Sequence, residues 1–204
     1  MYNFTFNIPT KIHFGKDTIS SLSELKAYGS KVLLVYGGGS IKKNGLYDTA
    51  MKILKDAGLT VFELSGVEPN PKIETVRKGV EICKNEGIDM VLAIGGGSTI
   101  DCSKVVAAGA RYDGDAWDLV LDGSKVKAAL PIFDVLTLSA TGTEMDPFAV
   151  ISDMSKNEKW GTGSPYMVPT MSILNPEYTF SVSKKTERQQ EPQIMRAIQW
   201  RYIF

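Results

Sequence analysis

The sequence predicts an α/β protein with a Rossmann-like parallel sheet that binds a nucleotide. The chain repeats the order buried strand, glycine turn, helix, first around Gly37-Gly38-Gly39-Ser40 and again around Gly95-Gly96-Gly97-Ser98. The strands before these turns, at 31–36 and 89–94, are continuous apolar runs of the kind buried on both faces of a parallel sheet. Such strands are joined by right-handed crossovers, and ligands bind beyond their carboxyl ends, where both turns lie.

The remaining elements follow from apolar spacing along the chain. Alternating or continuously apolar runs predict strands at 2–8, 10–14, 61–64, 130–138, 148–152 and 171–174. The first two form a strand pair or one bent strand, and the last two are joined across 158–169 as a hairpin. Apolar residues at three- or four-residue spacing predict helices at 18–26, 47–57, 71–87, with Pro71 in its first turn, and 99–110. Residues 113–127 are polar and interrupted by glycine, which predicts a surface excursion.

Composition excludes several classes of protein. The 23 Lys and Arg residues balance 23 Asp and Glu residues, so no positive field attracts a nucleic acid. No apolar run approaches the roughly 18 residues of a membrane span, and the N-terminus lacks the pattern of a signal peptide. Cys83 and Cys102 are too few for a disulfide framework and too far apart for a metal motif. We expect a cytoplasmic protein with neither membrane nor nucleic-acid partners.

The single histidine, His13, is of the residue type most used as an acid, a base or a metal ligand. It lies in the predicted strand at 10–14, remote in sequence from both glycine turns. We expect a solvent-facing strand residue rather than a ligand, so the sequence offers no catalytic residue.

The segment Gly95-Gly96-Gly97-Ser98-Thr99-Ile100-Asp101 is the strongest candidate site. It offers unhindered backbone N–H groups at the start of a helix, where the helix dipole favours an anion, so a diphosphate is the expected ligand. It matches neither the G-x-G-x-x-G fingerprint nor a P-loop. The alternative is a tight turn with Ser98 as the helix N-cap. Asp101, one helical turn further on, either caps the helix or holds a ribose or substrate hydroxyl.

Four motifs in order then point to a family. They are Gly37-Gly38-Gly39-Ser40, Pro69-Asn70-Pro71, the segment 95–101, and Leu136-Thr137-Leu138-Ser139-Ala140-Thr141-Gly142-Thr143-Glu144. Together they resemble the iron-containing (group III) alcohol dehydrogenases over about residues 3–184. Within that family the chain is most similar to the NADPH-dependent butanol dehydrogenase type, whose first turn resembles Gly-Gly-Gly-Ser-Ile-Lys-Lys here.

The resemblance implies a dinucleotide across the sheet edge, with its pyrophosphate at Gly96, Gly97 and Ser98. Asp101 then lies near the nicotinamide ribose, and Lys159 matches the family's cofactor-contacting lysine. The segment from Thr137 lines the cofactor, or else it is only a polar strand end and turn. The expected cofactor-binding residues are Gly37, Gly38, Gly39, Ser40, Asn70, Gly95, Gly96, Gly97, Ser98, Asp101, Thr137, Leu138, Ser139, Thr141 and Lys159.

The first turn bears on the choice between NAD(H) and NADP(H). Family members that prefer NAD commonly place an acid there, which binds the adenosine ribose and repels a 2′-phosphate. Here the turn has no acid, and Lys42 and Lys43 follow it closely. This favours NADP(H), with NAD(H) as the alternative, because cationic side chains attract a phosphate. The lysines are equally well explained as solvated residues at a helix start.

In the family, a helical second half supplies an aspartate and three histidines that hold a divalent metal, usually iron, which polarises the alcohol oxygen. We expect this all-helical metal domain, and with it any metal site, to be missing here. Residues 1–184 are then a dinucleotide-binding domain and 185–204 an aberrant tail. Read from the third base of the Glu187 codon, residues 188–194 permit Thr-Ala-Ala-Gly-Thr-Ala-Asp, and 197–204 permit a histidine four positions after that aspartate. We infer a frameshift.

The expected function is the cofactor-binding part of an alcohol dehydrogenase or aldehyde reductase. Such an enzyme transfers hydride between NAD(P)H and a small alcohol or aldehyde, and this chain alone is expected to be inactive. The alternatives are a non-catalytic nucleotide-binding remnant and a fragment of a glycerol dehydrogenase or dehydroquinate synthase relative. The N-terminal strands at 2–14 are expected to support a homodimer by edge pairing.

Overall fold

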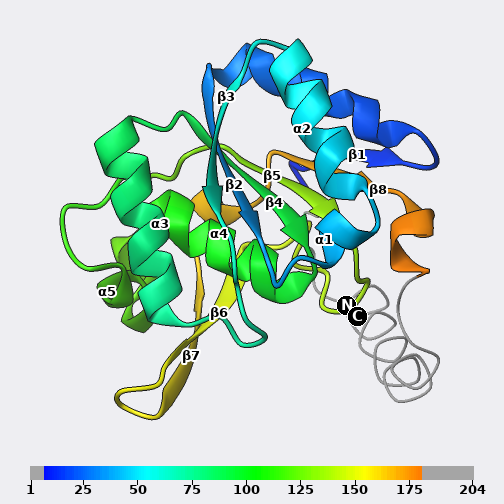
Figure 1. Ribbon diagram of the computed structural model, residues 1–204. Coiled ribbons are helices and arrows are strands. Elements are labelled where there is room, and N and C mark those ends of the chain that lie inside the picture. The colour runs from blue at the N-terminus through cyan, green and yellow to red at the C-terminus, as the bar shows by residue number, and fades with distance from the viewer. Residues whose placement is uncertain (1–6, 181–204) are drawn as a thin grey trace.

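The computed structural model describes residues 7–180. Within them, six strands form one sheet in the order β1-β8-β5-β4-β2-β3 (Figure 1). Every pairing in this sheet is parallel. The predicted Rossmann-like parallel sheet is therefore confirmed. Its strands are β1 (Lys11–Phe14), β2 (Lys31–Tyr36), β3 (Thr60–Leu64), β4 (Met90–Gly95), β5 (Ile132–Leu136) and β8 (Met171–Leu174).

Helices cover both faces of this sheet (Figure 1). The first face carries the 3₁₀ helix η1 (Thr18–Tyr28) with α1 (Ser40–Lys43) and α2 (Leu46–Asp56). The second face carries α3 (Ile73–Glu86), α4 (Gly97–Gly109) and α5 (Ala116–Leu121). Three short 3₁₀ turns complete the list: η2 (Gly123–Lys125), η3 (Pro165–Met167) and η4 (Pro176–Thr179).

The predicted helices are confirmed, with shifted ends. The three-residue spacing of Ile19, Leu22 and Leu25 buries all three on one side of η1, as expected for three residues per turn. The helix α3 begins two residues later than predicted. Lys72 is its N-cap and is extended, with φ −92° and ψ 146°, so Pro71 lies outside the helix.

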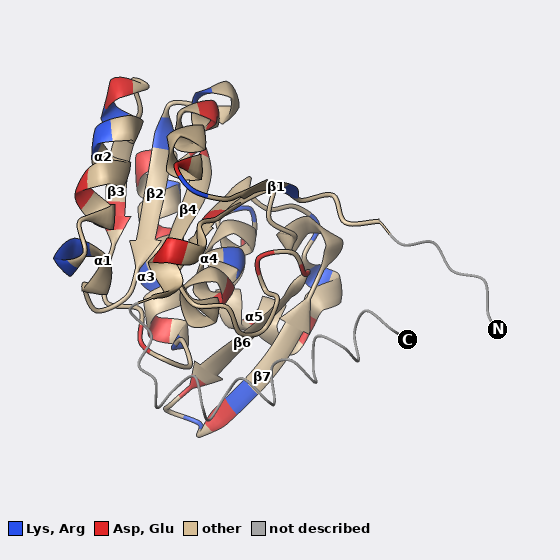
Figure 2. Ribbon diagram, turned by 90° about the vertical axis from the view of Figure 1, so that its right-hand side faces the viewer, with Lys and Arg blue, Asp and Glu red and all other residues tan. Residues whose placement is uncertain are grey.

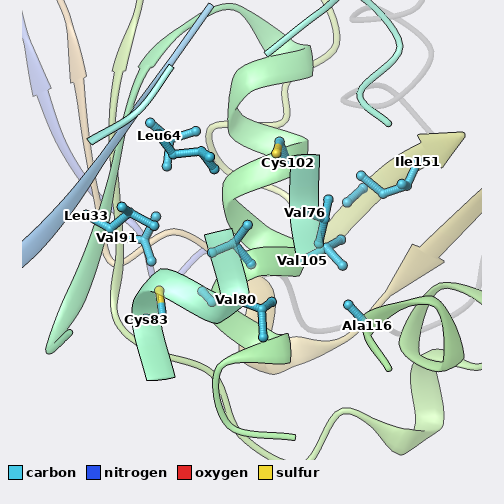
Figure 3. Close-up of a cluster of buried hydrophobic side chains, with 14 of the residues drawn as sticks. Leu33, Leu64, Val76, Val80, Cys83, Val91, Cys102, Val105, Ala116 and Ile151 are labelled. Atoms are coloured by element: carbon cyan, nitrogen blue, oxygen red, sulfur yellow. The ribbon is translucent and has the colours of Figure 1, made fainter. Parts of the chain in front are cut away.

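Two apolar clusters fill the space between the sheet and its helices. Leu33 and Val35 of β2 belong to the cluster with α3 and α4, whereas Val32 and Leu34 belong to the cluster with η1 and α2. Figure 3 shows the first cluster, where Leu33 faces the helices and Val105 projects from α4. Successive strand side chains point to opposite faces. Burial on both faces therefore explains the continuous apolar run that predicted β2.

The hairpin was predicted with the wrong second strand, at 171–174. The strand β6 (Phe148–Asp153) pairs in antiparallel fashion with β7 (Glu158–Gly163), and this two-stranded ribbon is separate from the main sheet. The strand β8 instead joins the main sheet between β1 and β5. No strand was predicted at β7, because five of its six residues are polar or glycine, and only Thr162 among them is buried.

The predicted surface excursion at 113–127 was also wrong. The helix α5 lies within it and buries Ala116, Trp117, Leu119 and Val120. Its start is fixed by the Asp115 side chain, which accepts a hydrogen bond from the Trp117 amide at 2.7 Å. The signal in the sequence for this helix was an aspartate, a common N-cap residue, followed by an apolar run.

The N-terminal prediction holds only for its second part. β1 corresponds to the predicted strand at 10–14 without Thr10, and it pairs in parallel with β8 at the edge of the sheet. Most of the predicted strand at 2–8 lies outside the described residues, and residues 7–10 form no strand. In the described residues, β1 pairs in parallel with β8, and an opening strand pair or bent strand that includes residues 2–6 stays a prediction.

We predict that Gly79→Ala destabilises the protein. A Cβ on Gly79 would lie 2.6 Å from Val106 Cγ2 and 2.8 Å from Leu64 Cδ2, so α3 must move away from α4 and β3. Overpacking of this kind costs about 1–3 kcal/mol, which outweighs the roughly 0.5–1 kcal/mol that alanine gains over glycine in a helix. Urea unfolding measures the change in the free energy of unfolding. The exposed Asn85→Ala on the same helix is the control, and equal stability of Gly79→Ala and wild type would contradict the tight packing.

Candidate functional site

The two glycine turns lie next to each other at one edge of the sheet. Tyr36, the last residue of β2, is in register with Ile94 of β4. Gly37 and Gly95 follow these two residues directly, so both turns leave neighbouring strands at their carboxyl ends. This is the edge at which α/β sheets of this type bind ligands.

The start of α4 has no side-chain cap. Gly96 occupies the N-cap position, and no side chain there accepts a hydrogen bond from the first turn. The alternative prediction of Ser98 as the N-cap is therefore wrong. Ser98 lies inside the first turn, and its amide and that of Gly97 face the end of the helix that attracts anions.

The predicted segment after β5 packs against this turn. A Cβ on Gly96 would lie 3.1 Å from Leu138 Cβ, and a Cβ on Gly97 would lie 3.1 Å from Thr141 Oγ1. The Thr137 amide donates to the Gly95 carbonyl at 2.9 Å. The turn and the segment are therefore in close contact, and a side chain on either glycine would have to push them apart. We name this junction, formed by residues 95–98 and 137–141, the cradle.

Two other predicted residues, far apart in sequence, meet in space. Lys159 Nζ of β7 donates to Asn70 Oδ1 at 2.6 Å across 89 residues of sequence. Asn70 has a left-handed backbone with φ 55°, a conformation that asparagine tolerates better than most residues. The Ser152 amide of β6 also donates to the Pro71 carbonyl at 2.9 Å, which ties the ribbon to the loop that carries Asn70.

Most predicted cofactor residues are accessible. Gly95 is buried, and the others are exposed or half-buried. Gly38 and Gly39 of the first turn have nothing within 4 Å of a Cβ placed on them. The structure therefore brings the turn 95–98 together with Thr137, Leu138 and Thr141, and separately pairs Asn70 with Lys159.

Asp101 does not cap α4, since it lies in the second turn of the helix. Its Oδ1 accepts a hydrogen bond from Thr143 Oγ1 at 2.6 Å, and its Oδ2 accepts one from the Val150 amide at 3.0 Å. Burial raises the pKa of this carboxyl, and the two hydrogen bonds act in the opposite direction. Asp101 thus ties α4 to the segment after β5 and to β6.

Lys104 is a site residue that the sequence did not single out. Its side chain is fully buried, and Nζ donates to Thr143 Oγ1 at 2.8 Å, to the Asp146 carbonyl at 2.8 Å and Oδ1 at 2.9 Å, and to the Phe148 carbonyl at 2.8 Å. Burial lowers the pKa of Lys104, and the charge of Asp146 opposes this shift. The signal in the sequence was a lone lysine in the run from Cys102 to Gly109, whose other residues are small or apolar.

Asp134 of β5 forms a second buried polar contact below the cradle. Its Oδ2 lies 2.6 Å from Ser172 Oγ of β8, and that hydroxyl lies 2.7 Å from the Glu144 carbonyl. Burial raises the pKa of Asp134 well above its ordinary value. Because Ser172 has one proton for two acceptors, a protonated Asp134 that donates to Ser172 satisfies both contacts.

An acidic residue from another strand lies next to the first turn. Glu63 of β3 accepts hydrogen bonds from Tyr36 at 2.6 Å and from Tyr47 at 2.8 Å. Lys42 Nζ lies 4.0 Å from Glu63 Oε2 and over the rings of Tyr36 and Tyr47, 5.0 and 4.4 Å from their centroids. The turn itself contains no acid, and an adjacent strand supplies one beside it.

The described residues offer no metal site. Residues 7–180 contain no group of three or more His, Cys, Asp or Glu side chains that could hold a metal ion. His13 is not solvent-facing as predicted: its side chain is 21% exposed, and Nε2 lies 3.3 Å from Glu24 Oε1. β1, which carries it, is separated from β4 by β8 and β5.

Acidic and basic residues occur together on some elements of the described chain. Figure 2 shows acidic and basic residues together on α2 and on β7 rather than gathered by sign. In the part of the chain covered by residues 7–180, no helix is long and apolar enough to cross a membrane.

A wound parallel sheet with glycine turns on neighbouring strands, and an uncapped helix start at one of them, defines a nucleotide-binding α/β protein. The sequence profile of the family described as iron-containing alcohol dehydrogenase matches residues 9–176. The chain belongs to this family.

Relatives and solved structures agree with this assignment. The chain is 60% identical over 185 residues to NADH-dependent butanol dehydrogenase A of Clostridium acetobutylicum, covering 90% of this chain and 48% of the relative. It is 40% identical to NADPH-dependent aldehyde reductase YqhD of Escherichia coli, covering 89% and 47%. The crystal structure of NADH-dependent butanol dehydrogenase A from Thermotoga maritima matches with a TM-score of 0.88 at 49% identity, covering 91% and 47%. The chain thus spans about half the length of the relatives it matches.

We predict that the free energy of unfolding of Asp134→Asn, relative to that of the wild type, increases as the pH rises. Burial holds the folded pKa of Asp134 well above its ordinary value of 3.8, so between these two values the folded protein holds a proton that the unfolded chain releases. Wild-type stability therefore falls with rising pH across that window, by about 1.4 kcal/mol per pH unit at most, and asparagine removes this contribution.

Thermal unfolding of both proteins between about pH 4 and pH 8 measures the effect. The exposed Asp56→Asn is the control and is expected to leave the pH dependence unchanged. A constant difference between Asp134→Asn and wild type over the whole range would mean that Asp134 is ionised in the folded protein.

Proposed function

We propose that this chain is the cofactor-binding part of a metal-dependent alcohol dehydrogenase or aldehyde reductase. The reaction is hydride transfer between a nicotinamide cofactor and a small alcohol or aldehyde. The observation that carries the proposal is the cradle, where an uncapped helix start meets glycines on which a side chain would push the turn and the segment after β5 apart. Family membership and the names of the relatives support the reaction class.

In this proposal the pyrophosphate lies at Gly96, Gly97 and Ser98. The helix dipole and the first-turn amides of α4 stabilise its charge. The adenosine half extends over the first turn at Gly37–Ser40, and the nicotinamide half extends over the end of β5. The remaining proposed contacts are Asn70, Gly95, Asp101, Thr137, Leu138, Ser139, Thr141 and Lys159.

For the choice of cofactor, we propose NAD(H), with NADP(H) as the second candidate. The lack of an acid within the turn and the presence of Lys42 and Lys43 favour NADP(H). Two observations favour NAD(H). Glu63 already pairs with Lys42, and its charge opposes a 2′-phosphate at this end of the sheet. Relatives 60% and 58% identical to this chain are named NADH-dependent.

The family's metal ion supplies Lewis-acid chemistry to the alcohol oxygen when it is bound. The described residues do not fit it, so no step through a metal is assigned to them. We propose that this chain alone does not turn over substrate. An assay of aldehyde reduction by the chain with NADH or NADPH and added ferrous or zinc ion tests this proposal, and measurable turnover would contradict it.

The division into a domain at 1–184 and an aberrant tail at 185–204 is likewise a proposal. The tail lies outside the described residues. Sequencing the gene around the Lys185 codon tests the frameshift, and a correct frame without the alternative codons would end it.

We also propose a homodimer formed through β1, in the cytoplasm. β1 is an edge strand whose Phe14 is 71% exposed, so a second copy can pair with it. Cys83 and Cys102 are free and buried, which suits a reducing compartment. A monomer in size-exclusion chromatography would count against the dimer.

Gly97→Ala is expected to weaken dinucleotide binding. Its methyl group enters the cradle 3.1 Å from Thr141 Oγ1, where the pyrophosphate approaches the backbone. Isothermal titration calorimetry with NADH is expected to show a Kd at least about tenfold higher, equivalent to roughly 1.4 kcal/mol. Gly161→Ala on β7, where a Cβ meets only Val150 Cγ2 at 4.0 Å, is the matched control. An unchanged Kd for Gly97→Ala would remove the pyrophosphate from this turn.

Glu63→Gln is expected to shift the preference toward NADPH. Removing the carboxylate charge leaves Lys42 without its anionic partner and removes the repulsion of a 2′-phosphate. The ratio of the Kd for NADPH to the Kd for NADH is expected to exceed one in wild type and to fall severalfold in the variant. Glu81→Gln, an exposed change on α3, serves for comparison. A wild-type ratio below one would assign NADP(H) to this chain.

A further inference from the structure

The contacts around Asp101 form a chain of hydrogen bonds with a fixed direction. Lys104 Nζ can only donate, and it donates to Thr143 Oγ1 at 2.8 Å. The Thr143 hydroxyl therefore uses its oxygen to accept from Lys104 and its single proton to donate to Asp101 Oδ1, 2.6 Å away. The ammonium group thus determines where the proton of Thr143 points, and this determines which oxygen of Asp101 it holds.

The inner end of this chain is rigid. Lys104 has three N–H donors and four acceptor oxygens within 2.9 Å, all of them in residues 143–148. Its side chain is 0% exposed and Thr143 is 3% exposed, so water does not compete for these contacts. Asp101 is half-buried and is therefore less enclosed than Lys104 and Thr143.

Asp101 lies on the side of the cradle that is formed by the segment after β5 and by β6. The helix rises about 1.5 Å per residue, so Asp101 is about 6 Å along α4 from Gly97. Its partners are Thr143, in the segment after β5, and Val150 of β6. In the order β5-β4-β2-β3, this side is opposite to the first turn after β2. A dinucleotide with its pyrophosphate over the β4 turn therefore places one nucleoside at each side.

We propose that Thr143 is a positioning residue that aims the Asp101 carboxylate at the nicotinamide nucleoside. Each carboxylate oxygen can accept more than one hydrogen bond, so Asp101 keeps acceptor positions for a ribose hydroxyl after Thr143 and Val150 have donated. Thr143 also lies beside the pyrophosphate turn, since a Cβ on Gly97 would be 3.8 Å from Thr143 Cγ2, and a valine at this position keeps that methyl group. This inference rests on the proposed function, because it assumes that a nicotinamide dinucleotide occupies the cradle.

The matched variants Thr143→Val and Thr143→Ser test this role. Valine keeps the shape of threonine and removes the hydroxyl, whereas serine keeps the hydroxyl. The two probes are NADH and ADP, measured by isothermal titration calorimetry on the 204-residue chain. ADP has the phosphates and the adenosine but no nicotinamide nucleoside, so its affinity reports whether the cradle itself is intact.

Thr143→Val is expected to raise the Kd for NADH by about fivefold to tenfold, as for the loss of one hydrogen bond that orients a charged acceptor. The Kd for ADP is expected to stay within about twofold of wild type, and Thr143→Ser is expected to restore the NADH affinity to within about twofold. If Thr143 acted on stability alone, Thr143→Val would weaken the binding of NADH and ADP together, and such a result would overturn the proposal. An unchanged NADH affinity in Thr143→Val, or a serine variant as weak as valine, would also overturn it.

The same experiment separates this inference from the function on which it rests. Wild-type chain that binds neither NADH nor ADP would overturn the proposed function and this inference with it. Wild-type chain that binds both, with a Thr143→Val variant that behaves identically, would overturn only the role of Thr143.

Discussion

A single buried ammonium group fixes one wall of the site. Removing a charged group from water costs several kcal/mol unless polar partners replace the water. Lys104 has such partners in four oxygens of residues 143–148, and none of its surface is exposed. The segment after β5 cannot leave α4 without exposing or unpairing this charge. The distance between the glycine turn and Thr141 therefore depends on a contact that lies below both.

The buried acids near Lys104 divide into different roles. Asp146 neutralises the ammonium group through a 2.9 Å ion pair. Asp134 contacts Ser172 instead; burial raises the pKa of its carboxyl group, and the contact joins β5, β8 and the Glu144 carbonyl. Asp101 is half-buried and accepts hydrogen bonds from Thr143 and from the Val150 amide. The charge of Lys104 is thus balanced inside the protein by Asp146, and Asp101 remains as a partly exposed hydrogen-bond acceptor.

The parts of the fold that the sequence could predict depend on local pattern. The continuous apolar runs of β2 and β4 and the glycine turns after them were found because burial on both faces leaves a readable composition. The ribbon partner β7 was missed because pairing alone, without burial, defines it. Lys104 and Glu63 were missed for a further reason. Their partners are 39 and 27 residues away in sequence, so only the folded chain shows that they are satisfied.

The contrast between the two glycine turns follows from their neighbours. At the second turn, the segment after β5 packs closely against glycines that a methyl group would crowd. At the first turn, Gly38 and Gly39 face open space, and the nearby charges of Lys42 and Glu63 offset one another. In the proposed binding mode, geometry governs recognition of the diphosphate at the second turn. At the first turn, the proposed determinant of adenosine ribose recognition is the balance between one lysine and one glutamate, so a change of charge there is expected to alter cofactor preference without disturbing the cradle.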